Sequence, residues 1–352
     1  NTLGGGAIFF TGTGKAIMQT DSYDKAYFKG NHAEVEGGAI VVGGNAELTL
    51  RGYKFTENTS NLSAAAIYVK GKLTDTNGYY YKNMVSSEDV SNAKGGAIQC
   101  HLYKSIAQMK FTDTVFEENS TPGDGGAIYN NGKSITLKDC TLVNNMSRQG
   151  GAIYNKSKAT LVNVDIDEAS YKGDAGSCIY VAKDGTLSLD DIKMNSIGTG
   201  KDSHAILNNG GTVLTVKDAT KSVTIHNVAG HGIVNMGEGT TELVGVSIQD
   251  VNGSGRYAVY SDSGSINLKD IAIQNVAKDA VYVKGGTATV EDATIENIKR
   301  AAITATETTD TDNNVTATGE VTLKNVTVKV SENAEDGARA AQYGIYCVRG
   351  KV

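Results

Sequence analysis

The peptide "EGGAIVV" (Glu36–Val42) recurs along the chain with small changes, as "DGGAIYN" (Asp124–Asn130) and "QGGAIYN" (Gln149–Asn155). Self-similarity at intervals of roughly 22 to 32 residues is typical of repeat architectures, in which neighbouring units stack on one another. The aliphatic residue after each small residue therefore marks one repeat. These markers are Ile8, Ile40, Ile67, Ile98, Ile128, Ile153, Ile179, Ile206, Ile233, Val259, Val281, Ile303 and Ile345.

A second pattern follows each marker and reads apolar–x–apolar–x–Asx–apolar–x–apolar. "ITLKDCTL" (Ile135–Leu142) and "ATVEDATI" (Ala288–Ile295) are clear copies. Alternation on both sides of the polar residue predicts two short strands, and an Asp or Asn between them suits a tight bend. Each repeat therefore supplies three strands. The bend residues are Asp139, Asn163, Asp191, Asp270, Asp292 and Asn325.

Repeats of this length with three β segments and no helical period predict an all-β solenoid. The six-residue rhythm of a left-handed hexapeptide helix is missing, and so is the leucine-rich repeat signature. We predict a right-handed parallel β-helix of about a dozen coils, with the markers stacked inside it as one aliphatic ladder. One domain is expected over residues 1–352, with regular coils in 1–200 and diverged coils in 201–352.

In the first half the third strand leads into the pattern FxxN, at Phe28–Asn31, Phe55–Asn58 and Phe116–Asn119. Asparagine amides stacked in this way are expected to hydrogen-bond to one another along the axis. The pairing of GGA[I/L/V] with FxxN, best over residues 4–155, resembles the repeats of the chlamydial polymorphic membrane proteins. Similar repeats occur in adhesin-like surface proteins of gut bacteria and archaea. The resemblance implies a β-helical autotransporter passenger that acts as an adhesin.

Bulk properties exclude several classes of function. The net charge of −6 suggests no basic field for nucleic acid, and no apolar run is long enough to span a membrane. Cys100, Cys140, Cys178 and Cys347 form no CxxC or clustered pattern, which disfavours zinc and a disulfide framework. The chain opens without Met or a signal peptide, so we expect a piece of a longer exported protein. We also expect that the chain binds no cofactor.

Tyrosines supply the candidate binding residues. A residue directly after an inward-facing marker points outward, so tyrosines there predict a surface stripe, or else a ladder that only stabilises the sheet. These tyrosines include Tyr129, Tyr154, Tyr180, Tyr260 and Tyr282. "NGYYYKN" (Asn77–Asn83) is interpreted as a projecting loop that binds a partner, with a disordered loop as the alternative. Its candidates are Tyr79, Tyr80 and Tyr81.

Titratable residues stand two positions before the marker in four consecutive coils of the second half. The two histidines are spaced like their markers, which predicts neighbouring rings. Such a row could form the acid–base site of a polysaccharide lyase or hydrolase. The alternative is a solvated turn, or inward histidines satisfied by their neighbours. The four residues are His204, His231, Tyr257 and Asp279.

One stretch has the alternation of a calcium loop. In "DTDNN", oxygen ligands alternate at Asp310, Asp312 and Asn314. The glycine expected at the sixth position and the glutamate expected at the twelfth are missing, which favours a solvated loop.

No nucleophile–base triad or phosphate-binding loop is visible. We expect a non-catalytic adhesin segment, extracellular or on the bacterial cell surface, that binds a host cell-surface protein or glycan. The segment is expected to be monomeric, without membrane insertion and without a nucleic-acid partner. The alternatives are the polysaccharide lyase or hydrolase and a structural spacer of a larger surface protein.

Overall fold

The computed structural model describes residues 4–20, 26–103, 106–167, 170–171, 176–198, 203–216, 223–309, 311, 315–329, 343–348 and 350–352. Every regular element within these ranges is a β-strand. The chain forms two compact units, Asn1–Tyr180 with Gly185–Leu187, and Val181–Asp184 with Ser188–Val352. One domain over the whole chain stays a prediction.

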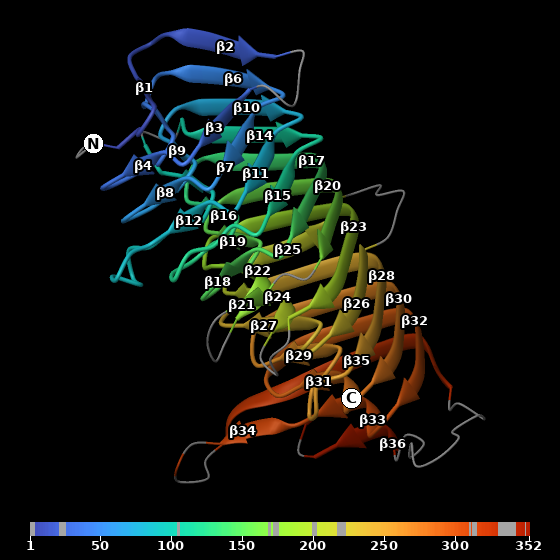
Figure 1. Cartoon of the computed structure of the whole chain (residues 1–352). Helices are drawn as coiled ribbons and strands as arrows, with labels where there is room; N and C mark the ends of the chain where they lie inside the picture. Colours follow the sequence, from blue (N-terminus) through green and yellow to red (C-terminus); the bar gives the residue numbers. More distant parts are fainter. Residues whose placement is uncertain are drawn as a thin grey trace. The chain divides into compact units, whose positions relative to one another are not determined.

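The markers of the first unit lie on parallel strands, one in each coil, drawn from blue to green in Figure 1. Their register keeps the markers together, since Ile40 lies beside Ile67 and Ile128 beside Ile153. The marker isoleucines from Ile40 to Ile153 are fully buried, and each stabilises the coil by about 1.5–3 kcal/mol. The strands are β1 (Ile8–Phe10), β5 (Ile40–Val42), β9 (Ile67–Val69), β13 (Ile98–Cys100), β16 (Ile128–Asn130), β19 (Ile153–Asn155) and β22 (Ser177–Val181).

The two further strands of each coil flank the predicted bend. In β17 (Ser134–Val143) and β20 (Lys158–Asp167) they merge into one element. Its bend residues, Asp139 and Asn163, have φ of 54° and 51°, a left-handed conformation that Asp and Asn tolerate better than most residues. The predicted Asx bend is confirmed.

In the earlier coils the same two strands remain separate elements. The first set is β2 (Lys15–Gln19), β6 (Glu47–Arg51), β10 (Lys72–Thr76) and β14 (Gln108–Thr112). The second set is β3 (Tyr27–Lys29), β7 (Lys54–Thr56), β11 (Tyr79–Tyr81) and β15 (Val115–Glu117). Short strands that the sequence did not predict follow, namely β4 (His32–Ala33), β8 (Thr59–Ser60), β12 (Met84–Val85), β18 (Met146–Ser147) and β21 (Ser170–Tyr171).

The glycine pair turns the chain into the marker strand. Gly125 has φ of 76°, which L side chains rarely adopt. Gly126 has no room for a side chain, because an added Cβ would collide with the carbonyl oxygen of Gly151 in the next coil. Both glycines are therefore needed for backbone geometry.

An asparagine ladder runs along the inside of the first unit. The Nδ2 of Asn58 donates to Oδ1 of Asn83 at 2.8 Å, and Asn83 donates in the same way to Asn119 at 2.9 Å. Asn119 continues to Asn145 at 3.0 Å. The predicted amide stacking is confirmed, and Asn83 is a member that the FxxN pattern had not identified.

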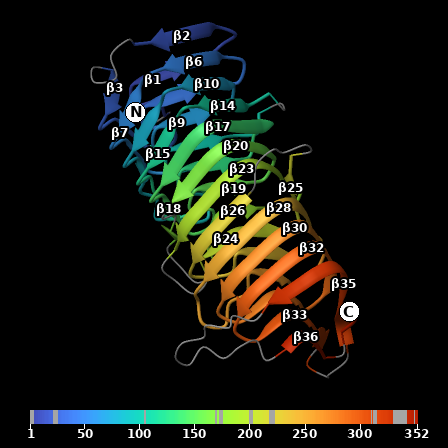
Figure 2. The ribbon, with the colours of Figure 1, turned by 90° about the vertical axis from the view of Figure 1, so that its right-hand side faces the viewer.

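The second unit repeats the plan with longer strands, seen from yellow to red in Figure 2. Its marker strands are β24 (His204–Asn209), β27 (Ile233–Met236), β29 (Val259–Ser261), β31 (Asp279–Val283), β33 (Ala301–Ala305) and β36 (Tyr343–Cys347). The others are β23 (Thr186–Ile197), β25 (Thr212–Thr215), β26 (Val223–Val228), β28 (Thr240–Val251), β30 (Ser265–Val276), β32 (Gly286–Ile298), β34 (Glu307–Thr309) and β35 (Val315–Lys329). Both units are all-β parallel β-helices, as predicted.

Candidate functional site

The stretch "NGYYYKN" is part of the β-helix wall, which corrects its interpretation as a projecting loop. Tyr79–Tyr81 form β11, which pairs in parallel with β7 and β15. Tyr80 is fully buried and stacks between Phe55 and Phe116, with ring centroids 4.9 and 4.8 Å away. Tyr80 therefore takes the place of the phenylalanine in FxxN, and it is not exposed for binding.

The Tyr80 hydroxyl meets a carboxyl group in the interior. It donates to Oδ2 of Asp75 at 2.7 Å, and both side chains are fully buried. Asp75 lies beside Leu50 and Phe111 in the neighbouring coils, at a position where apolar residues face inward. Burial raises the pKa of Asp75 to about 7, although the Tyr80 hydroxyl favours the ionised form.

Tyr79 and Tyr81 face outward on either side of Tyr80, as strand alternation requires. Their rings stack at 5.8 Å, and the Tyr79 hydroxyl donates to Oε2 of Glu117 at 2.6 Å. The same outward positions in the two preceding coils hold more tyrosine and lysine. We call this surface the tyrosine–lysine face, consisting of Tyr27, Lys29, Lys54, Thr56, Tyr79 and Tyr81.

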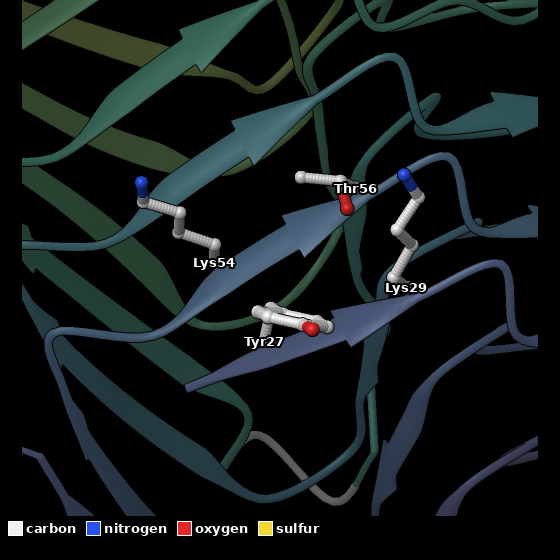
Figure 3. A pocket seen from close by; sticks show the side chains of 4 residues that line it. All are labelled: Tyr27, Lys29, Lys54 and Thr56. Carbon is white, nitrogen blue, oxygen red and sulfur yellow. The ribbon is translucent and has the colours of Figure 1, made fainter. Parts of the chain in front are cut away.

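Four residues of this face line a hollow of about 350 Å³ on β3 and β7. Figure 3 shows Tyr27, Lys29, Lys54 and Thr56 projecting from the same side of these two strands. None of them was a sequence candidate. The sequence pattern that could have identified them is the alternation around the phenylalanines in "YFKGN" (Tyr27–Asn31) and "KFTEN" (Lys54–Asn58). Because each phenylalanine faces inward, its two neighbours face outward.

The predicted stripe of Tyr129, Tyr154 and Tyr180 exists as a stack, but it is not an open surface. The rings stack at 5.0 and 4.7 Å. Tyr129 and Tyr180 are each only 6% exposed, which corrects the expected exposure. The ladder alternative, which stabilises the sheet, describes this arrangement better.

Charged residues lie against this stack. Asp124, itself buried, pairs with Lys94 at 2.6 Å and with Arg148 at 2.7 Å. The Lys94 ammonium also lies 5.4 Å from the centroid of the Tyr129 ring. Lys94 and the stacked ring of Tyr154 therefore both cover Tyr129.

In the second unit, His204, His231 and Tyr257 lie in consecutive coils with their rings stacked at 4.9 and 5.0 Å. The neighbouring histidine rings are as predicted. Nδ1 of His204 accepts from the backbone N–H of His231 at 3.0 Å, and Nδ1 of His231 accepts from that of Tyr257 at 2.9 Å. Each neutral imidazole therefore carries its proton on Nε2, and it has no free lone pair to act as a base.

Electrostatics keep these histidines neutral. Burial lowers the pKa of His204 to about 4, and the nearby Arg256 guanidinium acts in the same direction. The pKa of His231 falls to about 3, from burial first and then from His204 and Arg256. Arg256 Nη1 lies 3.3 Å from Nε2 of His231, but both groups carry protons, so Arg256 acts here as a nearby positive charge.

Asp279, the fourth residue of the row, is held by fixed partners. Its Oδ1 accepts from Nε of Arg300 at 2.6 Å and from the backbone N–H of Ala301 at 3.2 Å. Its Oδ2 accepts from the Thr304 hydroxyl at 3.0 Å, and the carboxylate is fully buried. The Tyr257 hydroxyl accepts from Lys278 Nζ at 2.7 Å.

Tyr260 and Tyr282 flank this row and are half-buried. Their rings stack on each other at 5.8 Å, and Tyr282 also stacks on Tyr257 at 4.5 Å. The Tyr260 hydroxyl donates to Oδ1 of Asp262 at 3.1 Å. The two tyrosines therefore extend the ring stack.

Other candidates contribute no described site. Asp310, Asp312 and Asn314 lie outside the described residues. Within the described part of the chain, no cluster of three or more His, Cys, Asp or Glu residues is placed to hold a metal ion. Those same residues include no helix of a length and apolarity that would cross a membrane.

The four cysteines carry free thiols. Cys100, Cys140 and Cys178 are buried, and Cys347 is exposed. Burial raises the pKa of Cys100 and Cys140 to about 12, so these thiols are protonated and poor nucleophiles at neutral pH.

Comparison with known protein families finds one match, to a short repeat. The model of the Chlamydia polymorphic membrane protein repeat matches residues 113–131, which contain one FxxN and one GGAI element. No curated protein sequence matches the chain.

Solved structures with a similar fold are β-helical enzymes. The catalytic domain of a GH87 alpha-1,3-glucanase in complex with tetrasaccharides aligns at TM-score 0.42 and 13% identity, over 98% of this chain and 64% of that one. The chain thus spans less than two thirds of that domain. A mutant of the periplasmic alginate epimerase AlgG aligns at TM-score 0.39 and 11% identity, over 91% of this chain and 77% of that one. The chain is a parallel β-helix in which residues 113–131 match the repeat of the Chlamydia polymorphic membrane proteins.

Proposed function

We propose that the chain is a non-catalytic segment of a bacterial surface adhesin, located outside the cell, that binds a host cell-surface protein or glycan. The observation that carries the proposal is the tyrosine–lysine face. Outward tyrosine rings combine an apolar body with a polar tip, which favours them in recognition surfaces. The chlamydial-type repeat at residues 113–131 supports a surface location.

The tyrosine–lysine face includes Tyr27, the most exposed of the described tyrosines. Tyr27 is 59% exposed, whereas Tyr129 and Tyr180 are nearly covered and Tyr80 is in the core. Lys29 and Lys82 add exposed ammonium groups beside these rings, and Lys82 lies 4.9 Å from the centroid of Tyr81. A partner therefore finds the exposed ring of Tyr27 and the half-buried rings of Tyr79 and Tyr81 on one outer face.

The proposal is tested with the double variant Tyr79→Ser/Tyr81→Ser. Binding of the purified chain to host cells should fall at least about tenfold, because two aromatic contacts are lost. The matched control is Thr141→Ser/Val143→Ser, which changes the same outward positions two coils further on. Undiminished binding by a folded Tyr79/Tyr81 variant would remove this face from the proposal.

The alternative is a polysaccharide lyase or hydrolase that uses His204, His231, Tyr257 and Asp279. The hydrogen bonds of these groups count against it, since both imidazoles accept from backbone N–H groups and the carboxylate is bound by Arg300. Incubation with a panel of uronate and neutral glycans tests this alternative. Turnover that disappears in His231→Asn would favour the enzyme.

The second alternative is a spacer that holds another domain away from the cell. A spacer predicts that the chain binds neither host cells nor glycans in the assays above. Retained cell binding in the control and its loss in the Tyr79/Tyr81 variant would contradict it.

A further inference from the structure

The hollow on β3 and β7 has a defined chemistry. Tyr27 presents an exposed aromatic ring, and the described residues that line the hollow add the two ammonium groups of Lys29 and Lys54 and the Thr56 hydroxyl. No acidic side chain is among these four residues. Figure 3 shows the Tyr27 ring between the lysine side chains, with Thr56 on the Lys29 side. The hollow thus combines the apolar face of an aromatic ring, two positively charged ammonium groups and a hydroxyl group.

We infer that this hollow is a subsite for one acidic sugar residue, carboxylated or sulfated, of a glycan that crosses the tyrosine–lysine face. The C–H face of a pyranose ring packs on Tyr27 as it does on other aromatic rings. The ammonium groups of Lys29 and Lys54, which lie on opposite sides of the Tyr27 ring in Figure 3, attract the carboxylate or sulfate, and the Thr56 hydroxyl bonds a sugar hydroxyl. The inference rests on the proposed adhesin function and narrows its ligand class.

The spacing of the strands supports a glycan over an acidic peptide. Tyr27, Lys54 and Tyr79 share one outward column, and neighbouring strands are about 4.8 Å apart. A pyranose unit advances a glycan chain by a similar distance, so successive sugars meet successive coils. An acidic peptide would use the lysines but would not need the exposed ring of Tyr27.

Freeing the Lys29 ammonium group to bind an anion costs little within the protein. The Lys29 ammonium pairs with Glu57 at 3.6 Å, and both side chains are more than half exposed. Exposed pairs of this kind contribute at most about 1 kcal/mol, so a ligand carboxylate or sulfate can take the place of Glu57. The attraction between ligand and ammonium should weaken as salt is added.

The test uses the full chain and a panel of tetrasaccharides, with oligogalacturonate, chondroitin sulfate, heparin and sialylated members, and neutral maltotetraose for comparison. Calorimetry should detect binding of at least one acidic member and weaker binding of maltotetraose. Tyr27→Ala should lower that affinity about tenfold and Lys54→Gln about threefold. Tyr27→Phe keeps the ring and should bind as the parent does. Lys72→Gln, an exposed lysine on β10, is the control.

The outcomes separate this inference from the proposed function. Loss of acidic-sugar binding in Tyr27→Ala but not in Tyr27→Phe or Lys72→Gln supports the subsite. Equal binding of maltotetraose, or of a poly-glutamate peptide, overturns the acidic-sugar assignment. No binding of any panel member, with host-cell binding intact, overturns the subsite and leaves the adhesin proposal standing. Absence of both overturns both.

Discussion

Single buried polar residues inside the coils hold neighbouring coils together through hydrogen bonds. The amide of Asn119, fully buried, donates to Asn145 at 3.0 Å and to the carbonyl of Tyr80 at 2.9 Å. Its Oδ1 accepts from the backbone N–H and from Nδ2 of Asn83. One side chain thus satisfies polar groups in two neighbouring coils, which an apolar residue could not do.

Asn119→Ala should therefore lower the free energy of unfolding of the first unit by about 2–4 kcal/mol, since it leaves several buried polar groups unpaired. Urea unfolding followed by circular dichroism measures the change. Asn61→Ala is the matched control, because Asn61 is exposed and its side-chain amide hydrogen-bonds to the exposed side chains of Glu34 and Ser86. A loss in Asn119→Ala no larger than in this control would contradict the role of the ladder.

The buried pair of Asp75 and Tyr80 predicts a pH response at the same scale. The unfolded carboxyl has a pKa of about 3.9, and burial raises the folded pKa to about 7. Between these values the folded state holds a proton that the unfolded chain has released. The free energy of unfolding should therefore fall by up to about 4 kcal/mol as the pH rises from about 4 to 7, and it should stay level above that.

Asp75→Asn keeps an acceptor for the Tyr80 hydroxyl and removes the titration. Its urea midpoint should change less between pH 5 and pH 8 than that of the parent chain. The same pH slope in both proteins would show that Asp75 ionises normally in the folded state.

At the scale of elements, ring residues that lie at the same distance from their markers stack on one another, because the marker strands pair in register. β24 and β27 pair with Ile206 beside Ile233, so His204 and His231, each two residues earlier, stack. The next coils add Tyr257, Tyr260 and Tyr282 to the same stack. In the row that suggested acid–base chemistry, the two histidines are thus rungs of a stack, and Nδ1 of each accepts a hydrogen bond from the backbone of the next coil.

This stack predicts that acid destabilises the second unit. The folded pKa values of His204 and His231, about 4 and about 3, lie below the unfolded value of about 6.5. The unfolded chain therefore binds protons that the folded stack excludes. Stability should be complete above about pH 6.5 and should fall by about 2 kcal/mol per histidine between pH 7 and pH 5.

The double variant His204→Asn/His231→Asn tests this, because asparagine can accept a hydrogen bond but does not titrate. Thermal unfolding at pH 7 and pH 5 should show a smaller difference in the variant than in the parent chain. A parent chain as stable at pH 5 as at pH 7 in its second unit would contradict the prediction.

At the scale of the whole molecule, these groups predict opposite pH responses in the two units. The raised pKa of Asp75 favours the first unit in mild acid, whereas the lowered pKa values of His204 and His231 disfavour the second unit there. Burial also lowers the pKa of His101 in the first unit, which partly offsets the effect of Asp75. Hydrogen exchange, corrected for the intrinsic rates, should show amides of β16 and β19 better protected at pH 5 than at pH 8, and amides of β27 and β29 less protected. Shifts of the same sign in both units would refute this.

Much of the architecture was predictable because local chemistry decides it. Asp139 and Asn163 mark bends, since Asx residues tolerate the left-handed conformation found there. Tyr80 was misassigned because the expected repeat contained phenylalanine, although the distance from Asn58 to Asn83 matched a single coil. The exposure of Tyr129 also could not be predicted, since it depends on Lys94 and Asp124 from other parts of the coil.

The sequence by itself determined the parallel β-helix, because small corner residues, aliphatic markers and Asx bends act through backbone conformation and alternation within each repeat. Only the tertiary structure decided which polar side chains reach solvent, because that depends on what the neighbouring coils place beside them. The side chains of His204 and Asp279 accept hydrogen bonds from adjacent coils, whereas those of Tyr27 and Lys29 are exposed to solvent. The burial of a side chain and its hydrogen-bond partners depend on the neighbouring coils. For this reason the candidate site is the tyrosine–lysine face and not the row of titratable residues.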